Sequence, residues 1–229
     1  MNHQVLMTTD AGRRSESRFE VFPEQMKHLE RLLCQFGKVV SYDKRGASSI
    51  ASFYYECLKI RRDTNASIRQ RTYLVGELGE FLRLPCVVDA KVNLPEGPQL
   101  KWRRSYENWM EAHAQLTSPV QERPRDIFPE LVHHYGGLGS LTVPYGVMYR
   151  RRYFSLPGGA RATLDDAIHV LNVDSGLRPT IAHTLPHSIL EMKQRLEDAP
   201  LPAEFNKHLA ELSLAWSDSK RAHARAVFK

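Results

Sequence analysis

The chain has 229 residues, of which 42% are hydrophobic and 25% are charged, and its formal net charge is +6. This composition excludes a disordered chain, because the apolar share is sufficient for a buried core, and the length fits one domain or two small ones. The positive charge favours an anionic partner, namely nucleic acid, membrane headgroups or phosphorylated metabolites. Many proteins have basic surfaces without such a partner, so the charge alone does not choose among these classes.

The predicted elements begin after a flexible N-terminal segment at residues 1–15. Alternating polar and apolar residues predict a strand at 16–22, and apolar residues at helical spacing predict a helix from Pro23 to about Phe36. Further strands are expected at 50–56, 67–75, 86–92, 99–105, 145–155, 160–172 and, as one strand or two, 181–193. Further helices are expected at 105–116, 127–135 and 202–215, before a basic tail. About eight strands joined by short turns predict an α+β fold: a closed antiparallel eight-stranded β-barrel with peripheral helices.

Several of these strands place Arg or Lys at alternate positions. Residues i and i+2 of a strand point to the same face, so Arg69 lies beside Arg71, and Glu191 lies beside Lys193. Taken alone, such a row fits the solvated face of an ordinary strand. Inside a barrel, charges are costly unless something binds them. The expected ligand is then a polyanion, a chain of phosphates with a divalent metal.

Nine short motifs follow one another along nearly the whole chain. They lie at 16–19, 52–56, 69–71, 89–91, 101–104, 149–154, 161–165, 190–193 and, as a helix start with a Ser-Lys pair, 202–220. In this order they resemble the VTC domain, the catalytic domain of polyphosphate polymerases, which belongs to the triphosphate tunnel metalloenzyme superfamily. Three positions depart from the family pattern: Arg18 replaces a lysine, Asp89 a glutamate and Arg221 an aromatic residue.

The resemblance implies one VTC-like tunnel domain at 16–229, whose eight strands bind a nucleoside triphosphate and a growing polyphosphate chain. It implies a divalent metal, Mg²⁺ or Mn²⁺, on Glu191, since hard cations prefer carboxylate and phosphate oxygens. The catalytic residues that it implies are Arg71, Arg151, Arg161 and Glu191. The substrate-binding residues that it implies are Arg18, Arg69, Lys91, Lys193, Ser219 and Lys220. The basic positions at 101–104 are left open.

The expected function is transfer of the γ-phosphate of a nucleoside triphosphate to polyphosphate, as in a polyphosphate polymerase. Phosphoryl transfer rests on positioning and charge stabilisation, so fixed cations can supply most of it without a protein nucleophile. The superfamily's hydrolases carry Glu-x-Glu-x-Lys on the first strand, where this chain has Arg14, Glu16 and Arg18, which favours the polymerase branch. The alternatives are a triphosphate or nucleotide phosphohydrolase of the same fold and a non-catalytic module that binds polyphosphate or another polyanion. Nucleic acid is not an expected partner.

Two other groups of residues are expected to carry no chemistry. Cys34, Cys57 and Cys86 lack metal spacing and are expected to be reduced thiols of a cytoplasmic protein. His183 and His187 flank a proline without a third ligand nearby in the sequence, so both are expected to be ordinary polar or capping residues. No apolar run reaches the length of a membrane-spanning helix and no signal-peptide core is present, although a peripheral membrane partner and the oligomeric state stay open.

Overall fold

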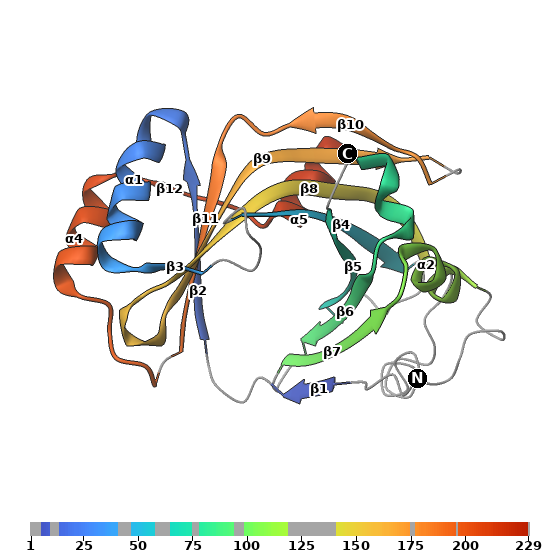
Figure 1. Cartoon of the computed structure of the whole chain (residues 1–229), viewed down its shortest axis with the longest axis horizontal. Coiled ribbons are helices and arrows are strands. Elements are labelled where there is room, and N and C mark those ends of the chain that lie inside the picture. The colour runs from blue at the N-terminus through green and yellow to red at the C-terminus, as the bar shows by residue number, and fades with distance from the viewer. Residues whose placement is uncertain are drawn as a thin grey trace. The chain divides into compact units, whose positions relative to one another are not determined.

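The structure is a computed structural model, and it describes residues 6–9, 14–40, 47–57, 65–74, 78–93, 99–118, 141–174, 177–195 and 197–228. Within these ranges the architecture is α+β, with twelve strands and four α-helices (Figure 1). The chain packs as two compact units. The first unit comprises Met1–Ala11, Ala51–Gly146 and Asn172–Thr180, and the second comprises Gly12–Ile50, Val147–Leu171 and Ile181–Lys229.

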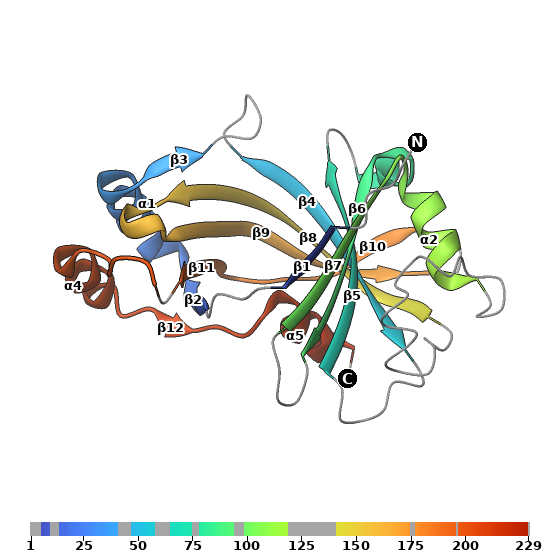
Figure 2. The same ribbon diagram turned by 90° about the horizontal axis from the view of Figure 1, so that it is seen from below.

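The first unit is built on four neighbouring antiparallel strands in the order β1-β7-β6-β5, followed by β4. Their bounds are β1 Leu6–Thr9, β4 Ser48–Cys57, β5 Asn65–Leu74, β6 Cys86–Asn93 and β7 Gln99–Tyr106. A short 3-10 helix, η1 (Leu78–Arg83), and helix α2 (Trp109–Thr117) pack on these strands, and Figure 2 shows β5, β6 and β7 side by side with α2 at one end.

Aromatic rings form the core of the first unit. Phe53 of β4 stacks on Phe81 of η1 with 4.8 Å between ring centroids, and both rings meet the edge of Trp109 at 5.1 and 5.0 Å. All three side chains are fully buried. Helix α2 begins where Asn108 caps it, since the Asn108 side chain accepts a hydrogen bond from the backbone N–H of Glu111 at 2.8 Å.

The second unit is built on strands in the order β8-β9-β11-β2-β12, with β3 on β8 and β10 on β9. The strand bounds are β2 Arg14–Val21, β3 Lys38–Val40, β8 Leu141–Ser155, β9 Arg161–Val173, β10 Pro179–Thr184, β11 Ser188–Arg195 and β12 Ala215–Trp216. The helix bounds are α1 Pro23–Phe36, α4 Ala203–Glu211 and α5 Lys220–Val227. The strand pairs β1–β7, β5–β6, β6–β7, β2–β11, β9–β11, β2–β12 and β3–β8 are all antiparallel.

Helices α1 and α4 lie side by side and cover the sheet of the second unit (Figure 1). Their apolar faces join a core that includes Leu29 and Leu33 of α1, Leu164 of β9, Leu190 of β11 and Phe205 of α4. The burial of such side chains, at about 1.5–3 kcal/mol each, is the main stabilising term of the unit.

Strands β8 and β9 form a hairpin through a short 3-10 turn, η2 (Pro157–Gly159). Gly158 and Gly159 have φ angles of 68° and 78°, a left-handed conformation that glycine adopts without strain. The hairpin predicted around this Pro-Gly-Gly sequence is therefore confirmed. The same holds for the strand that precedes α1 and for α1 itself, which ends at Phe36 as the apolar spacing predicts.

Several elements differ from the sequence-based prediction. The helix predicted at 105–116 begins later, because the chain is still extended in β7 up to Tyr106 and the cap is at Asn108. Strand β1 lies inside the segment predicted to be flexible, and α5 lies in the predicted basic tail. The helix predicted at 127–135 lies outside the described residues. Among those that are described, no helix is long and apolar enough to cross a membrane.

The predicted α+β class and the large antiparallel sheet are confirmed. The described residues contain more strands than the eight expected, because β1, β3, β10 and β12 add short segments to the long strands. In the described pairing β1 and β12 each have one neighbour, so the strand order has two ends. Closure into an eight-stranded barrel, and a single domain at 16–229, stay predictions.

Candidate functional site

In the second unit, strands β2, β11 and β9 align charged residues in rows. Arg18 on β2 is the direct cross-strand partner of Glu191 on β11. In the neighbouring row, Glu16 of β2, Lys193 of β11 and Arg161 of β9 stand opposite one another. Residues two apart in a strand point to the same face, so both rows project from one face of the sheet.

Four of these side chains form a closed ring of alternating charge. Lys193 Nζ lies 2.9 Å from Glu191 Oε1 and 3.2 Å from Glu16 Oε2. Arg18 donates from Nε to Glu191 Oε2 at 3.3 Å and from its guanidinium to Glu16. Arg161 is exposed at the edge of this ring and makes no ion pair with any residue that the structure describes. We call the four ion-paired residues the charged ring.

A buried carboxylate holds two further cations near the charged ring. Asp165 of β9 is fully buried and accepts hydrogen bonds from Arg151 of β8, at 2.7 Å for Nη2, and from Lys220 of α5. The charged ends of Arg151 and Lys220 each lie 5.1 Å from the centroid of the Tyr149 ring. Burial alone would raise the pKa of Asp165, but Lys220 and Arg151 outweigh burial and hold it below the usual value.

Glu191 is a second carboxyl of this unit whose pKa the surrounding cations lower. Burial alone would raise its pKa, but the charges of Lys220, Lys193 and Arg151 outweigh burial and hold the pKa well below the usual value. The lowered pKa keeps the Glu191 carboxyl ionised, and because the side chain is 12% exposed a ligand can still reach it. A carboxylate of this kind is a suitable ligand for a hard divalent cation, and Glu16 on the same face offers a second set of oxygens.

The charged ring opens onto a pocket of about 350 Å³. Arg161 and Lys193 line this pocket together with Arg195, Asp198 and the turn at Gly159. Three cations against one carboxylate make the lining net positive. The pocket therefore suits an anionic group that comes to the exposed end of the rows.

In the first unit, a second carboxylate lies between two arginines. Arg69 of β5, Asp89 of β6 and Arg103 of β7 occupy one row of the sheet. Arg69 Nη2 and Arg103 Nε each lie 2.8 Å from a carboxylate oxygen of Asp89, which is 2% exposed. Burial would raise the pKa of Asp89, but Arg69 and Arg103 outweigh it and hold the pKa well below its usual value.

Three more cations share this face of β5, β6 and β7. Lys91 and Lys101 are direct cross-strand partners in the next row, and Arg71 follows two residues after Arg69. Burial lowers the pKa of Lys101, and the neighbouring arginines lower it further although Asp89 raises it. The Nε of Arg71 is buried and has no hydrogen-bond partner in the described part of the chain. Among the described residues, this face thus carries five cations and one carboxylate. We call this surface the basic face.

The predicted site residues divide between these two clusters. The second unit contains Arg18, Arg151, Arg161, Glu191, Lys193, Ser219 and Lys220, and the first contains Arg69, Arg71 and Lys91. Ser219 caps helix α5, because its Oγ accepts a hydrogen bond from the Ala222 backbone N–H at 3.2 Å. The roles assigned to all of these residues stay predictions.

Sequence reasoning missed the partners of these cations. Asp165 closes the motif at 161–165, but the sequence does not indicate that it faces Arg151 and Lys220. Lys101 and Arg103, which the sequence left open, lie on the basic face, whereas Arg104 has the opposite parity and packs 5.2 Å from the Tyr106 ring. The i, i+2 alternation of Lys101 with Arg103 was the available signal.

Comparisons with known proteins identify a shared fold. No protein-family model and no curated protein matches the sequence. Among solved structures, a candidate adenylyl cyclase from Hippeastrum that is described as having a dominant triphosphatase activity is similar, with 15% identity, a TM-score of 0.54 and coverage of 93% of this chain and 96% of that chain. A candidate adenylate cyclase from Bacillus halodurans is similar with 13% identity, a TM-score of 0.52 and coverage of 89% and 91%. The chain therefore has the fold of these two proteins.

Proposed function

We propose that the chain is a metal-dependent phosphoryl-transfer enzyme that acts on a nucleoside triphosphate. The observation that carries the proposal is the charged ring, in which the ionised and still accessible Glu191 lies between Arg18 and Lys193. Such a set offers a carboxylate for a divalent cation and cations for the phosphates that the metal would bridge. The Hippeastrum protein, which has the same fold and is described as a triphosphatase, supports a triphosphate as the substrate.

In this proposal Glu191, with Glu16 beside it, holds Mg²⁺ or Mn²⁺, which supplies neutralisation of the phosphate charge when bound. Arg18 and Lys193 give up part of their contact with the two glutamates and bind phosphate oxygens instead. Arg161 is ion-paired with none of the carboxylates that the structure describes, so it binds phosphate at the least cost. Forked contacts from arginines fix the orientation of the phosphoryl group, which is where most of the catalysis of phosphoryl transfer originates.

Arg151 and Lys220 act differently in this scheme. Both are anchored on Asp165, so their charges are fixed in place before substrate binds and need no reorganisation during the reaction. Both side chains are buried, and a charge acts more strongly where the surroundings screen it less. They stabilise negative charge that develops on the transferred group rather than hold the substrate through direct forks.

We further propose that the acceptor is the terminal phosphate of a polyphosphate chain. The bond between the β-γ bridging oxygen and the γ-phosphorus breaks, a terminal oxygen of the chain bonds to that phosphorus, and a nucleoside diphosphate leaves. Support comes from Arg14, which stands where the hydrolases of the superfamily carry the first carboxylate of Glu-x-Glu-x-Lys, and from the basic face, whose Arg69, Arg71 and Lys91 suit a long polyanion. In this proposal the strands close into the eight-stranded tunnel that the resemblance to the VTC domain implies.

A second candidate is hydrolysis, in which water replaces the polyphosphate end and orthophosphate is released. The description of the Hippeastrum protein favours this reaction. The same charges could also bind polyphosphate without any reaction. The three possibilities differ in their products, so one assay separates them.

The test incubates the purified protein with ATP and Mg²⁺ or Mn²⁺ and analyses products on a polyphosphate-stained gel and by phosphate assay. A ladder together with nucleoside diphosphate is expected, and it should weaken at least tenfold in Arg161→Gln but not in Arg31→Gln, which changes an exposed arginine of α1. Orthophosphate without a ladder would replace the polymerase with the hydrolase. A protein that binds polyphosphate but forms neither a ladder nor orthophosphate would contradict the proposal that the chain is an enzyme.

A further inference from the structure

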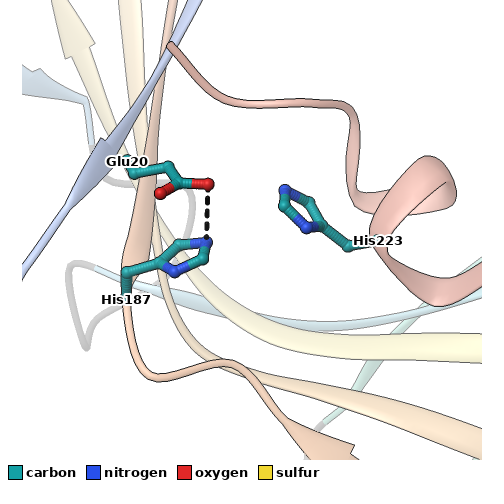
Figure 3. A group of neighbouring side chains, drawn as sticks. All are labelled: Glu20, His187 and His223. Carbon is teal, nitrogen blue, oxygen red and sulfur yellow. Dashed lines mark ion pairs between the residues drawn. The ribbon is translucent and has the colours of Figure 1, made fainter. Parts of the chain in front are cut away.

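Three side chains from distant parts of the sequence converge in the second unit (Figure 3). Glu20 comes from β2, His187 from the turn before β11, and His223 from helix α5. One ligand atom of each residue lies within 4.8 Å of those of the other two. His187 Nε2 lies 3.6 Å from Glu20 Oε1, and the two imidazole rings are 5.5 Å apart between centroids at 61°.

The nitrogen of His187 that points at Glu20 has no hydrogen-bond partner in the described part of the chain. The His187 side chain is 9% exposed, and its Nε2 is buried with no hydrogen-bond partner among the residues that the structure describes. Its distance to Glu20 exceeds that of a hydrogen bond. Native structures rarely leave a buried polar atom unsatisfied, so an atom of this kind points to a missing ligand. The edge contact of the ring with Phe22, at 5.7 Å, keeps this nitrogen directed toward the cluster.

The third residue is also available for coordination. Burial lowers the pKa of His223, and the charges of His187 and Lys220 lower it further although Glu20 and Asp218 raise it. Its Nε2 lies 3.2 Å from Ser217 Oγ, a contact that metal binding would replace, and the Ser217 hydroxyl keeps its hydrogen bond to the Asp218 carbonyl. A neutral imidazole is the form that binds metals.

We propose that Glu20, His187 and His223 bind a divalent transition metal of the zinc class. Two imidazole nitrogens with one carboxylate suit Zn²⁺, Co²⁺ or Ni²⁺, whereas Mg²⁺ and Ca²⁺ prefer oxygen ligands alone. Ligand atoms about 2.1 Å from a tetrahedral metal lie roughly 3.4 Å apart. The 3.6 Å between His187 Nε2 and Glu20 Oε1 already fits this value. The other pairs of ligand atoms lie within 4.8 Å, so they need to approach by at most about 1.4 Å. The fourth position is left for water.

The metal would connect helix α5 to the sheet. Helix α5 also carries Lys220, three residues before His223, and residues three apart lie on one side of a helix. Glu20 lies two residues after Arg18 on the same face of β2. The site therefore lies next to the charged ring but is separate from it, because the two share no residue. Its metal would fix α5 and so hold Lys220 on Asp165.

The experiment is a Co²⁺ titration of the untagged protein after removal of metals with a chelator, followed by displacement with Zn²⁺. Four-coordinate Co²⁺ bound to imidazole and carboxylate absorbs visible light much more strongly than aqueous Co²⁺ does. We expect a saturable signal from one Co²⁺ per chain, displaced by Zn²⁺. His223→Asn and His187→Asn should weaken Co²⁺ binding by more than the roughly 10–100-fold that outer-shell changes cost. His183→Asn, an exposed histidine four residues before His187, is the matched control and should bind as the wild type does.

Glu191→Gln separates this site from the proposed phosphate site, because it should leave the Co²⁺ signal unchanged. Zn²⁺ should also raise the unfolding temperature of the wild type and of His183→Asn, but not that of His223→Asn. Glu20→Gln, the more conservative change, serves if a histidine variant does not fold. No Co²⁺ signal in the wild type, a signal kept by the folded ligand variants, or equal weakening in His183→Asn would overturn the proposal and leave a packed pair of neutral histidines.

Discussion

Asp165→Asn is the substitution that most sharply tests how the cations of the second unit are held. The change keeps the shape of the side chain and removes the carboxylate that is ion-paired with both Arg151 and Lys220. Asp165 is 0% exposed, and each of the two cationic residues is 8% exposed, so water cannot replace the lost charge. The substitution therefore leaves two buried cations without their hydrogen-bonded carboxylate, and the charge of Glu191 compensates them only in part.

The cost follows from that burial. Removing one partner of a buried ion pair costs about 3–5 kcal/mol, which is a large share of the 5–15 kcal/mol that holds a typical domain folded. For a chain of this length the unfolding temperature should fall by roughly 6–20 °C. The sign with pH is also fixed: the lowered pKa of Asp165 contributes stability above the unfolded pKa, and this contribution is lost as the pH falls through the folded pKa.

The assay is urea unfolding at neutral pH, followed by circular dichroism. The matched control is Asp166→Asn on the same strand, whose partners Arg150 and Arg152 have side chains that are 59% and 25% exposed and can turn to water, so a loss of roughly 1–2 kcal/mol is expected. Adding Lys220→Met to Asp165→Asn should recover part of the stability, because it removes one uncompensated charge. A loss in Asp165→Asn no larger than in the control would refute the reasoning.

Three further predictions concern other parts of the chain. Asp89→Asn leaves the cations of the basic face without their carboxylate, so tripolyphosphate should bind roughly tenfold more tightly, with a steeper salt dependence, in calorimetric titrations; unchanged affinity would contradict the role of this face. Burial lowers the pKa of His113 from 6.5 to about 4, so this residue should make the free energy of unfolding decline by about 1–2 kcal/mol, after allowance for partial exposure, as the pH falls from about 6.5 to about 4. In urea titrations His113→Gln should remove this share of the decline, and an equal decline in both proteins would contradict the assignment. Gly158→Ala places a Cβ at φ 68° against backbone and should destabilise by about 1–3 kcal/mol; an unchanged unfolding temperature would contradict the turn geometry.

Local patterns were sufficient to predict much of this fold. The apolar spacing from Pro23 to Phe36 determines one face of α1, so both helix and bounds followed from the sequence. The alternation of Arg69 with Arg71 likewise placed both on one face of β5, because the side-chain period of a strand is fixed. These are properties of single elements, and a single element shows its own periodicity.

Pairing between elements could not be obtained in the same way. Asp165 meets Lys220 across 55 residues, and His187 meets His223 through a helix that the sequence suggested was only a basic tail. The apolar stripe of α5 is short and consists mostly of alanines, so it resembles a charged tail. The expectation that His187 has no third ligand nearby was correct along the sequence and wrong in space, because the fold supplies Glu20 and His223.

The central claim is that Glu191 serves a metal-dependent attack on a triphosphate, and one measurement tests it most directly. ATP labelled on the γ-phosphate is incubated with Mn²⁺ and either the wild type, Glu191→Gln or Glu197→Gln, a change at an exposed carboxylate paired with Arg195. Loss of label from ATP counts both transfer to polyphosphate and hydrolysis. We predict metal-dependent loss in the wild type and in Glu197→Gln, and a rate at least 100-fold lower in a folded Glu191→Gln. Equal rates in all three proteins, or no loss of label in the wild type with either metal, would contradict the account.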